Sequence, residues 1–331
     1  MADATPTRLG ALNGLQTTED QARALYNDVL LASEIIATFE EKNKFLPLVW
    51  NRTLTKGKSA TFPLIGKATA EYHTPGKEIQ GQTINNAEQT ITIDGKMISA
   101  VEISDLDVFM SEVEYRAPYT AELGRAMAKK MDINVAVEII KSARADSPVT
   151  GGNDGTEIAN DKFRVCTGGS STLADKALAL AEGLYQAAQT LDEKDVPEDG
   201  RVAYFRPADY YALVQNKDAI DQRWGGQGSY AEGNIVKIAG ISINMSNHIP
   251  STNLTTSDDT YHYVDASKTV GLVWVPQAVG VVKLMDLAME AVWDTRRQVW
   301  LILAKMAVGM GPVNPSCAVE LKLDLVTNAT A

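Results

Sequence analysis

Two glycine-containing segments of the sequence could bind phosphate groups through their backbone N–H groups. Lys56-Gly57-Lys58-Ser59 has the ending of a phosphate-binding loop, and Gly226-Gln227-Gly228 followed by Ala231 fits the loose dinucleotide pattern G-x-G-x-x-A. The first pattern has Arg52 in place of its opening glycine, and an extended, proline-containing segment follows it instead of a helix N-terminus. The second follows a polar segment rather than a buried strand. We interpret both as turns and predict no cofactor.

Side chains that could act as acids, bases, nucleophiles or metal ligands are present, but not at the spacing of a catalytic motif. His73, His248 and His262 are far apart, and none has a Cys, Asp or Glu in an H-E-x-x-H-like frame. The sequence has no G-x-S-x-G nucleophile elbow. Paired carboxylates, which glycosidase chemistry needs, arise by chance in an acidic chain: Asp105/Asp107, Glu112/Glu114 and Asp258/Asp259. We therefore predict no catalytic residue and no metal site. The remaining alternative is a site whose residues are distant in the sequence and come together only in the folded chain.

Composition and charge restrict the classes of partner. Of 331 residues, 45% are hydrophobic, which is enough for one large core or two ordinary ones. The 42 Asp and Glu against 31 Lys and Arg give a formal net charge of -11, which opposes binding to nucleic-acid phosphates. No window approaches the ~18 consecutive apolar residues of a membrane span, so no membrane is predicted as a partner. The N-terminus lacks a signal-peptide pattern, so Cys166 and Cys317 are expected to be reduced thiols in a cytoplasm.

The N-terminal segment is predicted to form an amphipathic helix behind an arm. Thr18 and Gln21 make a capping box, and Leu25, Tyr26 and Val29 follow among apolar residues at helical spacing. Nothing nearby in the sequence covers this apolar face. We therefore expect a neighbouring subunit to cover it.

Between residues 58 and 104 the apolar period changes to two, which predicts two strands joined by a polar segment with Pro and Gly. Pro63 confines the outgoing strand to a sheet edge or a bulge, and Asp94-Gly95 marks a turn or sharp bend in the returning strand. A lone hairpin is only marginally stable in water. This excursion is therefore expected to lean on another part of the protein.

A long helix is predicted to begin at Pro118 and to end before Ser147-Pro148. Its ~27 residues would span about 40 Å, which suits a scaffold. A polar loop then runs to Ser171 and is the best internal boundary. A helix from Thr172 to about Leu191 follows, and then strands and a short helix without strict βαβ repetition, so the predicted class is α+β.

The ordered set of segments resembles the major capsid proteins of short-tailed double-stranded DNA bacteriophages of the podovirus or autographivirus kind. GKSATFPLIGKATAEYHTPG at Gly57–Gly76 and ITIDGKMISAVEISDLD at Ile91–Asp107 look like that family's extended loop, and Tyr119–Ile140 looks like its spine helix. RVAYFRPADYYALVQ, Asn247-His248-Ile249-Pro250 and AVGVVKLMDLAMEAVWDTRRQVWLILAKMAVGMG are similar to the remaining landmarks, in the right order. The resemblance runs from about Asp20 to Leu325.

The resemblance implies the Hong Kong ninety-seven type phage capsid fold, in the α+β class. Its parts would be an N-terminal arm (1–57), an extended β-loop (58–100), a peripheral domain with the spine helix (101–146), an axial domain (147–290) and return strands of the peripheral domain (291–331). The implied function is structural, not enzymatic. The subunit would assemble into hexamers and pentamers of an icosahedral shell around packaged phage DNA.

The same resemblance implies the partners of the chain. These are copies of itself, a scaffolding protein during assembly, a portal protein at one vertex, a cement protein, and packaged DNA enclosed without sequence-specific binding. The expected location is the virion capsid, assembled in the cytoplasm of the bacterial host. The residues expected to contact a neighbouring subunit are Phe62, Leu64, Ile65 and Tyr72 of the extended loop and Leu25, Tyr26 and Val29 of the N-terminal arm.

Two other classes stay open. A protein compartment of the same fold would enclose enzyme cargo instead of DNA and would need an internal groove for a cargo peptide. A soluble enzyme would need a deep pocket with converging titratable groups.

Overall fold

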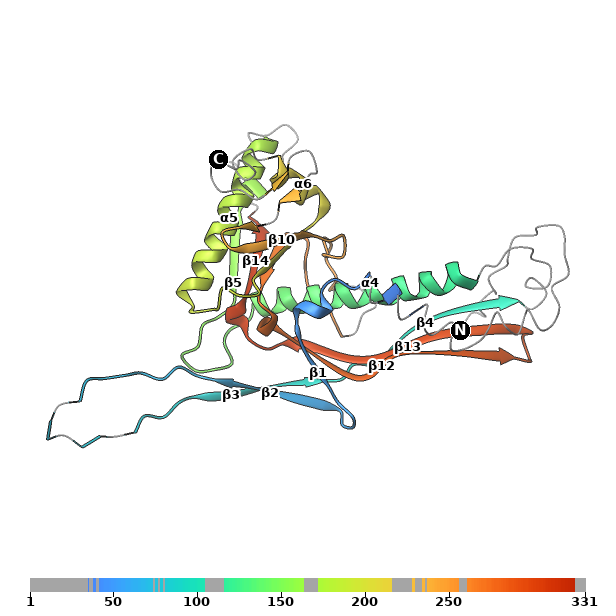
Figure 1. The fold of residues 1–331 in the computed structure, drawn as a ribbon, viewed down its shortest axis with the longest axis horizontal. Coiled ribbons are helices and arrows are strands. Elements are labelled where there is room, and N and C mark those ends of the chain that lie inside the picture. The colour runs from blue at the N-terminus through green and yellow to red at the C-terminus, as the bar shows by residue number, and fades with distance from the viewer. Residues whose placement is uncertain are drawn as a thin grey trace, which may run out of the picture.

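A long helix, α4 (Arg116–Ala143), lies between two sheets built from different parts of the chain (Figure 1). In this computed structural model the described residues are 35, 38–39, 42–73, 75–76, 78–79, 81–104, 116–163, 172–215, 228–229, 234–235, 237–255 and 261–324. The long helix expected from Pro118 is confirmed and begins two residues earlier. The mixture of helices and sheets confirms the expected α+β class.

The first sheet has four strands, of which two form a long antiparallel ribbon. The strand order is β1-β12-β13-β4, and β4 is an edge strand. β1 runs parallel to β12, whereas β13 is antiparallel to both β12 and β4. The strands are β1 (Trp50–Thr53), β4 (Lys96–Ser104), β12 (Val279–Asp294) and β13 (Val299–Pro312).

The second sheet has six strands and carries helix α5 (Leu173–Glu193) and the short helix α6 (Pro207–Val214). Its order is β5-β14-β11-β6-β10-β9. The strands are β5 (Thr156–Asn160), β6 (Val202–Phe205), β9 (Lys237–Ile238), β10 (Ile241–Met245), β11 (Thr269–Trp274) and β14 (Ala318–Leu323). β7 (Gly228–Ser229) pairs with β8 (Asn234–Ile235), and short 3-10 helices occupy Leu46–Leu48, Asp161–Phe163, Pro276–Ala278 and Pro315–Cys317. The helix expected from Thr172 is confirmed, and Thr172 caps it reciprocally with Asp175.

The sheets divide the chain differently from the boundaries expected at residues 100 and 290. Residue 100 falls inside β4, and residue 290 falls inside β12, which lies wholly in the four-stranded sheet. β14 joins the six-stranded sheet, whereas the expected division places residues 291–331 in the other unit. An apolar strand carries no local mark of the sheet it will join, so periodicity alone cannot place such a boundary.

The buried half of α4 carries polar side chains that bond other parts of the chain. The carboxylate of Asp132 accepts hydrogen bonds from Phe45 N (3.1 Å), just before the first strand, and lies 2.7 Å from His248 Nδ1. Near the end of the helix, Ser142 Oγ donates to the backbone oxygen of Ala278 at 3.2 Å. An unpaired buried polar group costs about 1–3 kcal/mol, so these bonds fix which segments lie against α4.

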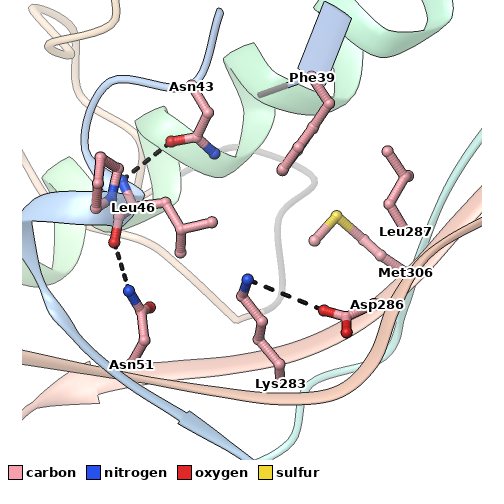
Figure 2. Close-up of a pocket in the computed structure, with 9 residues that line it drawn as sticks. Phe39, Asn43, Leu46, Asn51, Lys283, Asp286, Leu287 and Met306 are labelled. Atoms are coloured by element: carbon pink, nitrogen blue, oxygen red, sulfur yellow. Dashed lines mark hydrogen bonds and ion pairs between the residues drawn. The ribbon is translucent and has the colours of Figure 1, made fainter. Parts of the chain in front are cut away.

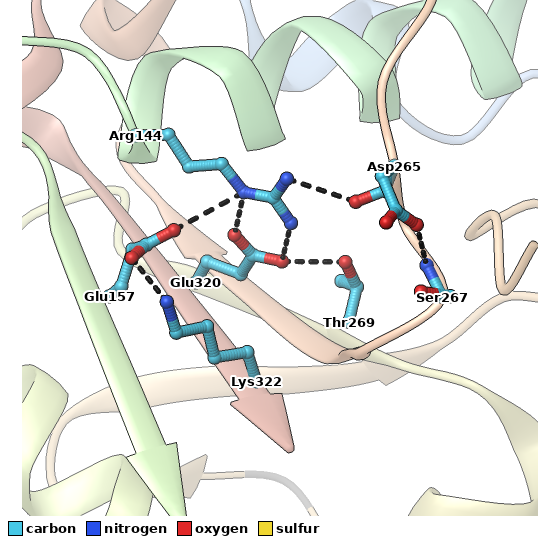
Figure 3. Close-up of polar contacts among 7 residues, drawn as sticks. All are labelled: Arg144, Glu157, Asp265, Ser267, Thr269, Glu320 and Lys322. Atoms are coloured by element: carbon cyan, nitrogen blue, oxygen red, sulfur yellow. Dashed lines mark hydrogen bonds and ion pairs between the residues drawn. The ribbon is translucent and has the colours of Figure 1, made fainter. Parts of the chain in front are cut away.

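Arg144, just beyond the end of α4, joins the helix to the six-stranded sheet (Figure 3). Its Nε and Nη2 atoms donate to the two oxygens of Glu320 on β14, at 2.6 and 2.7 Å, and Nε also lies 3.3 Å from Glu157 on β5. Glu320 is fully buried and also accepts a bond from Thr269 Oγ1 at 2.5 Å. The bond with Glu320 raises the pKa of Arg144 above its ordinary value. A bidentate pair of this kind fixes orientation as well as distance.

An antiparallel hairpin crosses the base of the β12–β13 ribbon and then projects away from the body (Figure 1). It consists of β2 (Ser59–Ile65), β3 (Asn86–Thr92) and the described residues between them, and we call it the extended hairpin. β2 pairs only with β3 among the described strands, which confirms the edge position that Pro63 predicts. The bend expected at Asp94-Gly95 is confirmed, because β4 then leaves β3 to join the ribbon.

Glycines on the ribbon allow this close crossing. A Cβ on Gly309 of β13 would lie 2.2 Å from the backbone oxygen of Thr92 and 2.8 Å from Ile93 Cα. A Cβ on Gly280 of β12 would lie 2.8 Å from side-chain atoms of Ile91, in the hairpin, and of Val313. The expectation that the hairpin leans on another part of the protein is thereby confirmed.

We predict that Gly309→Ala lowers the free energy of unfolding by about 2–3 kcal/mol, because the obstructing atoms are backbone and cannot rotate away. Gly311→Ala is the matched control, since its Cβ would meet only side-chain atoms of Ile91, at 3.2 Å or more, and it should cost less than half as much. Urea denaturation of both variants measures the difference. Equal losses would contradict the role of the crossing.

Candidate subunit interface

The base of the extended hairpin packs into a small hydrophobic cluster of its own chain. Phe62 on β2 has an exposed fraction of only 1% and packs with Ile91 of β3, Val282 of β12 and Val313. Trp50 contacts the Phe62 ring edge to face, with ring centroids 5.1 Å apart. Phe62 is thus a core residue of this chain, and almost none of its surface is available to a neighbouring subunit.

The other hairpin residues expected at an interface lie increasingly far from the body. Leu64 is partly buried against the small cluster, Ile65 has an exposed fraction of 79%, and Tyr72 is fully exposed. Every described residue from 67 to 85 is exposed, including Ile79. Isolated exposed apolar residues are common, but several on one projecting arm are typical of a surface that another molecule covers. Leu25, Tyr26 and Val29 of the N-terminal arm lie outside the described residues.

Polar contacts join the part of the extended hairpin that follows β2 and precedes β3 to loops that border the six-stranded sheet. Lys67 Nζ lies 2.6 Å from Asp195 Oδ2, beyond the end of α5, and Asn85 Nδ2 donates to the backbone oxygen of Thr150 at 3.3 Å. Lys67 lowers the pKa of Asp195. Both charged side chains are largely exposed, so this ion pair contributes little stability and salt screens it.

Sequence reasoning missed two exposed apolar groups on the body. Leu178 and Tyr185 lie on the solvent face of α5, and Tyr261 and Tyr263 flank a buried histidine before β11. A signal for the first pair was present, because seven residues are two helical turns and place both side chains on one face, away from the buried stripe. No comparable local signal distinguishes the two tyrosines.

A cavity of about 610 Å³ lies between the segment before β1 and the β12–β13 ribbon (Figure 2). Lys283 Nζ and Asp286 Oδ1 are 3.9 Å apart beside it, and Asn43 Oδ1 accepts a bond from Leu46 N at 3.0 Å. The buried Asn43 Nδ2 has no hydrogen-bond partner among the described residues. The other lining residues are Phe39, Pro47, Asn51, Leu287 and Met306. The described lining contains this one ion pair and no serine, cysteine or histidine.

Of the two glycine-containing segments, the first lies wholly within the described residues and the second does not. Gly57 has φ 120° in the turn before β2, which confirms the interpretation of Lys56-Gly57-Lys58-Ser59 as a turn feeding a strand. Gly228 lies in β7, whereas Gly226, Gln227 and Ala231 lie outside the described residues, as do the three carboxylate pairs.

The histidines and the described cysteine have structural surroundings. His73 is exposed on the hairpin, whereas His248 and His262 each contact a carboxylate of α4. Cys317 is buried, and burial raises the pKa of its thiol. Cys166 lies outside the described residues. Over the described ranges, no group of three His, Cys, Asp or Glu side chains is placed to hold a metal ion, and no helix has the length and apolarity to span a membrane.

Comparisons with known proteins give a consistent result over most of the chain. Residues 61–322 match a family described as Gp10A-like, major capsid protein. The chain is 26% identical over 310 residues to the major capsid protein of Escherichia phage T7, covering 87% of this chain and 89% of that one. It is also 38% identical to a chain in the capsid structure of cyanophage P-SCSP1u, with a TM-score of 0.73 and coverage of 85% and 88%. A chain of the mature capsid of bacteriophage PhiM1 has the same fold at 18% identity, with a TM-score of 0.73 and coverage of 87% and 88%.

We predict that Phe62→Asp lowers the free energy of unfolding by at least about 3 kcal/mol, because it leaves a cavity and an unpaired charge in the small cluster. Tyr72→Asp should change it by less than about 0.5 kcal/mol, since its side chain is fully exposed. Urea denaturation measures both. A Phe62→Asp chain as stable as the parent would show that Phe62 is not part of this core.

Proposed function

Because this chain belongs to the Gp10A-like family of major capsid proteins, we propose that its copies form the hexamers and pentamers of an icosahedral shell around packaged phage double-stranded DNA. The observation that carries the proposal is the 38% identity, over 85% of the chain, to a subunit of a cyanophage capsid structure. The curated relatives in phages T7 and T3 are also named major capsid proteins. These relatives are structural proteins, so no catalytic role is proposed.

The architecture suits a subunit that must occupy slightly different positions in one closed shell. Subunits in hexamers and pentamers need a stiff body and contacts that tolerate small changes of angle. The buried helix α4 and its two sheets supply the body, and the exposed residues of the extended hairpin supply a long contact arm. In this proposal Leu64, Ile65 and Tyr72 of the hairpin, and Leu25, Tyr26 and Val29 of the arm, contact neighbouring subunits.

The charge of the chain supports enclosure of DNA without sequence-specific binding. A net charge of -11 per copy repels phosphates, which helps DNA to move freely along an inner wall. The other proposed partners are a scaffolding protein during assembly, a portal protein at one vertex and a cement protein. Assembly would take place in the bacterial host cytoplasm and end in the virion.

Electron microscopy of the full chain, expressed alone and together with a candidate scaffolding protein, tests the shell. We expect closed icosahedral particles, and native particles should protect double-stranded DNA from nuclease. Particles that contain protein cargo instead of DNA would favour a compartment of the same fold. A persistent monomer under all conditions would overturn the proposal.

Shell formation should improve with salt. Copies that each carry a net charge of -11 repel one another, but at ~0.15 M salt the screening length is only about 8 Å, so short-range apolar contacts prevail. We predict more particles at ~0.5 M than at ~0.02 M NaCl, measured by light scattering with sedimentation. The opposite trend would mean that attraction between unlike charges, rather than apolar burial, drives assembly.

A further inference from the structure

We propose that His262, held as an imidazolium between Asp94 and Glu138, is a clasp that fixes the direction in which the extended hairpin leaves the body. Asp94 belongs to the bend between β3 and β4, and Glu138 belongs to α4. The clasp therefore joins the root of the projecting hairpin to the long helix that lies between the two sheets. Its consequence for assembly rests on the proposed function.

The hydrogen-bond geometry requires a charged ring. His262 Nε2 lies 2.9 Å from Asp94 Oδ2, and its Nδ1 lies 2.9 Å from Glu138 Oε1. Ionised carboxylates only accept hydrogen bonds, and a neutral imidazole has a single N–H to donate. Both bonds can form together only when both ring nitrogens carry protons. The side chain has an exposed fraction of 4%, so water does not replace either partner readily.

The pKa of His262 agrees with this geometry. Burial by itself lowers the pKa, but the hydrogen bonds and negative charges of Asp94 and Glu138 outweigh it and raise the pKa from 6.5 to about 9. Because the folded pKa is raised, the stabilisation is complete below pH 6.5 and is lost as the pH rises through about 9. The clasp is therefore closed at neutral pH and opens in alkaline solution.

Other titratable groups around the clasp balance its charge. Lys141 Nζ on α4 lies 2.7 Å from Glu138 Oε1, so the two carboxylates face two cations. The Tyr263 ring lies under Lys141 Nζ, 5.1 Å from it. The remaining groups at the adjoining cavity are Lys96 beside the bend, Lys130 on α4 and Tyr261. The experiment must therefore separate the contribution of His262 from those of these neighbours.

Because of the position of Asp94, its contact with His262 can set the direction of the hairpin. Only residues 93–95 separate β3, which pairs with β2, from β4, which pairs with β13. Asp94 N also donates to Val308 O of β13 at 3.1 Å, so the bend is held from two sides. The Lys67–Asp195 contact farther along the stem is exposed and screened by salt. Salt screens the buried clasp much less.

Hydrogen exchange of the full, unassembled chain in low salt tests the clasp. Protection factors are compared for residues 86–104 in the parent and in His262→Gln, with His248→Gln as the matched control. His248 bonds the same helix through Asp132, and no hydrogen bond joins it to a described residue of the hairpin. We expect parent protection in this region to fall at least about tenfold between pH 7 and 10, with most of the fall complete by pH 9. Protection of this region in His262→Gln should be low at both pH values. Protection in His248→Gln should follow that of the parent.

The clasp would be overturned if residues 86–104 were as well protected in His262→Gln as in the parent. It would also be overturned if protection in the parent did not fall up to pH 10. If His262→Gln does not fold, the pH series of the parent and of Asp94→Asn replaces it, and Asp94→Asn should lack the fall in protection between pH 7 and 9. These measurements need no shell. Failure of every variant, including the parent, to form particles would count against the proposed function and leave the clasp standing.

Discussion

The rest of the structure depends on the burial of α4 between two sheets. A helix enclosed in this way must find partners for each polar side chain that it carries into the interior. Asp132, Glu138, Ser142 and, beyond the helix end, Arg144 each bond a different part of the chain. The polar residues of one helix thereby determine where the N-terminal stretch, the segment before β11, the start of β12 and the six-stranded sheet must lie.

Close packing and an ion pair attach the extended hairpin to this body. Gly280 and Gly309 let the hairpin backbone approach the ribbon, and Phe62 fills the space that this approach creates. Farther out, the attachment weakens to the exposed Lys67–Asp195 pair, and the described residues of the hairpin beyond it are exposed. Stability therefore falls along the hairpin from root to tip. A gradient of this kind suits an arm whose root must hold its angle while its tip adapts to a neighbour.

The candidate interface was only partly predictable from the sequence. The alternation of β2 indicates that Phe62 and Leu64 share one face and Ile65 the other, but it does not say which face its own chain covers. The structure buries Phe62 in the chain's own core and leaves Ile65 and Tyr72 exposed. The same separation of a local pattern from a distant partner explains why no motif search could find the role of His262.

The sequence by itself determined the elements and several of their limits. Thr172 with Asp175 begins α5, Pro63 keeps β2 at an edge, and Asp94-Gly95 ends the pairing of β3, because caps, prolines and bends act within a few residues. Only the tertiary structure decided which sheet β12 and β14 join, which face of the hairpin is buried and which carboxylates hold His262. The physical reason is separation along the chain. His262 and Glu138 are 124 residues apart, and no local pattern records a contact that exists only once both sheets have packed on α4.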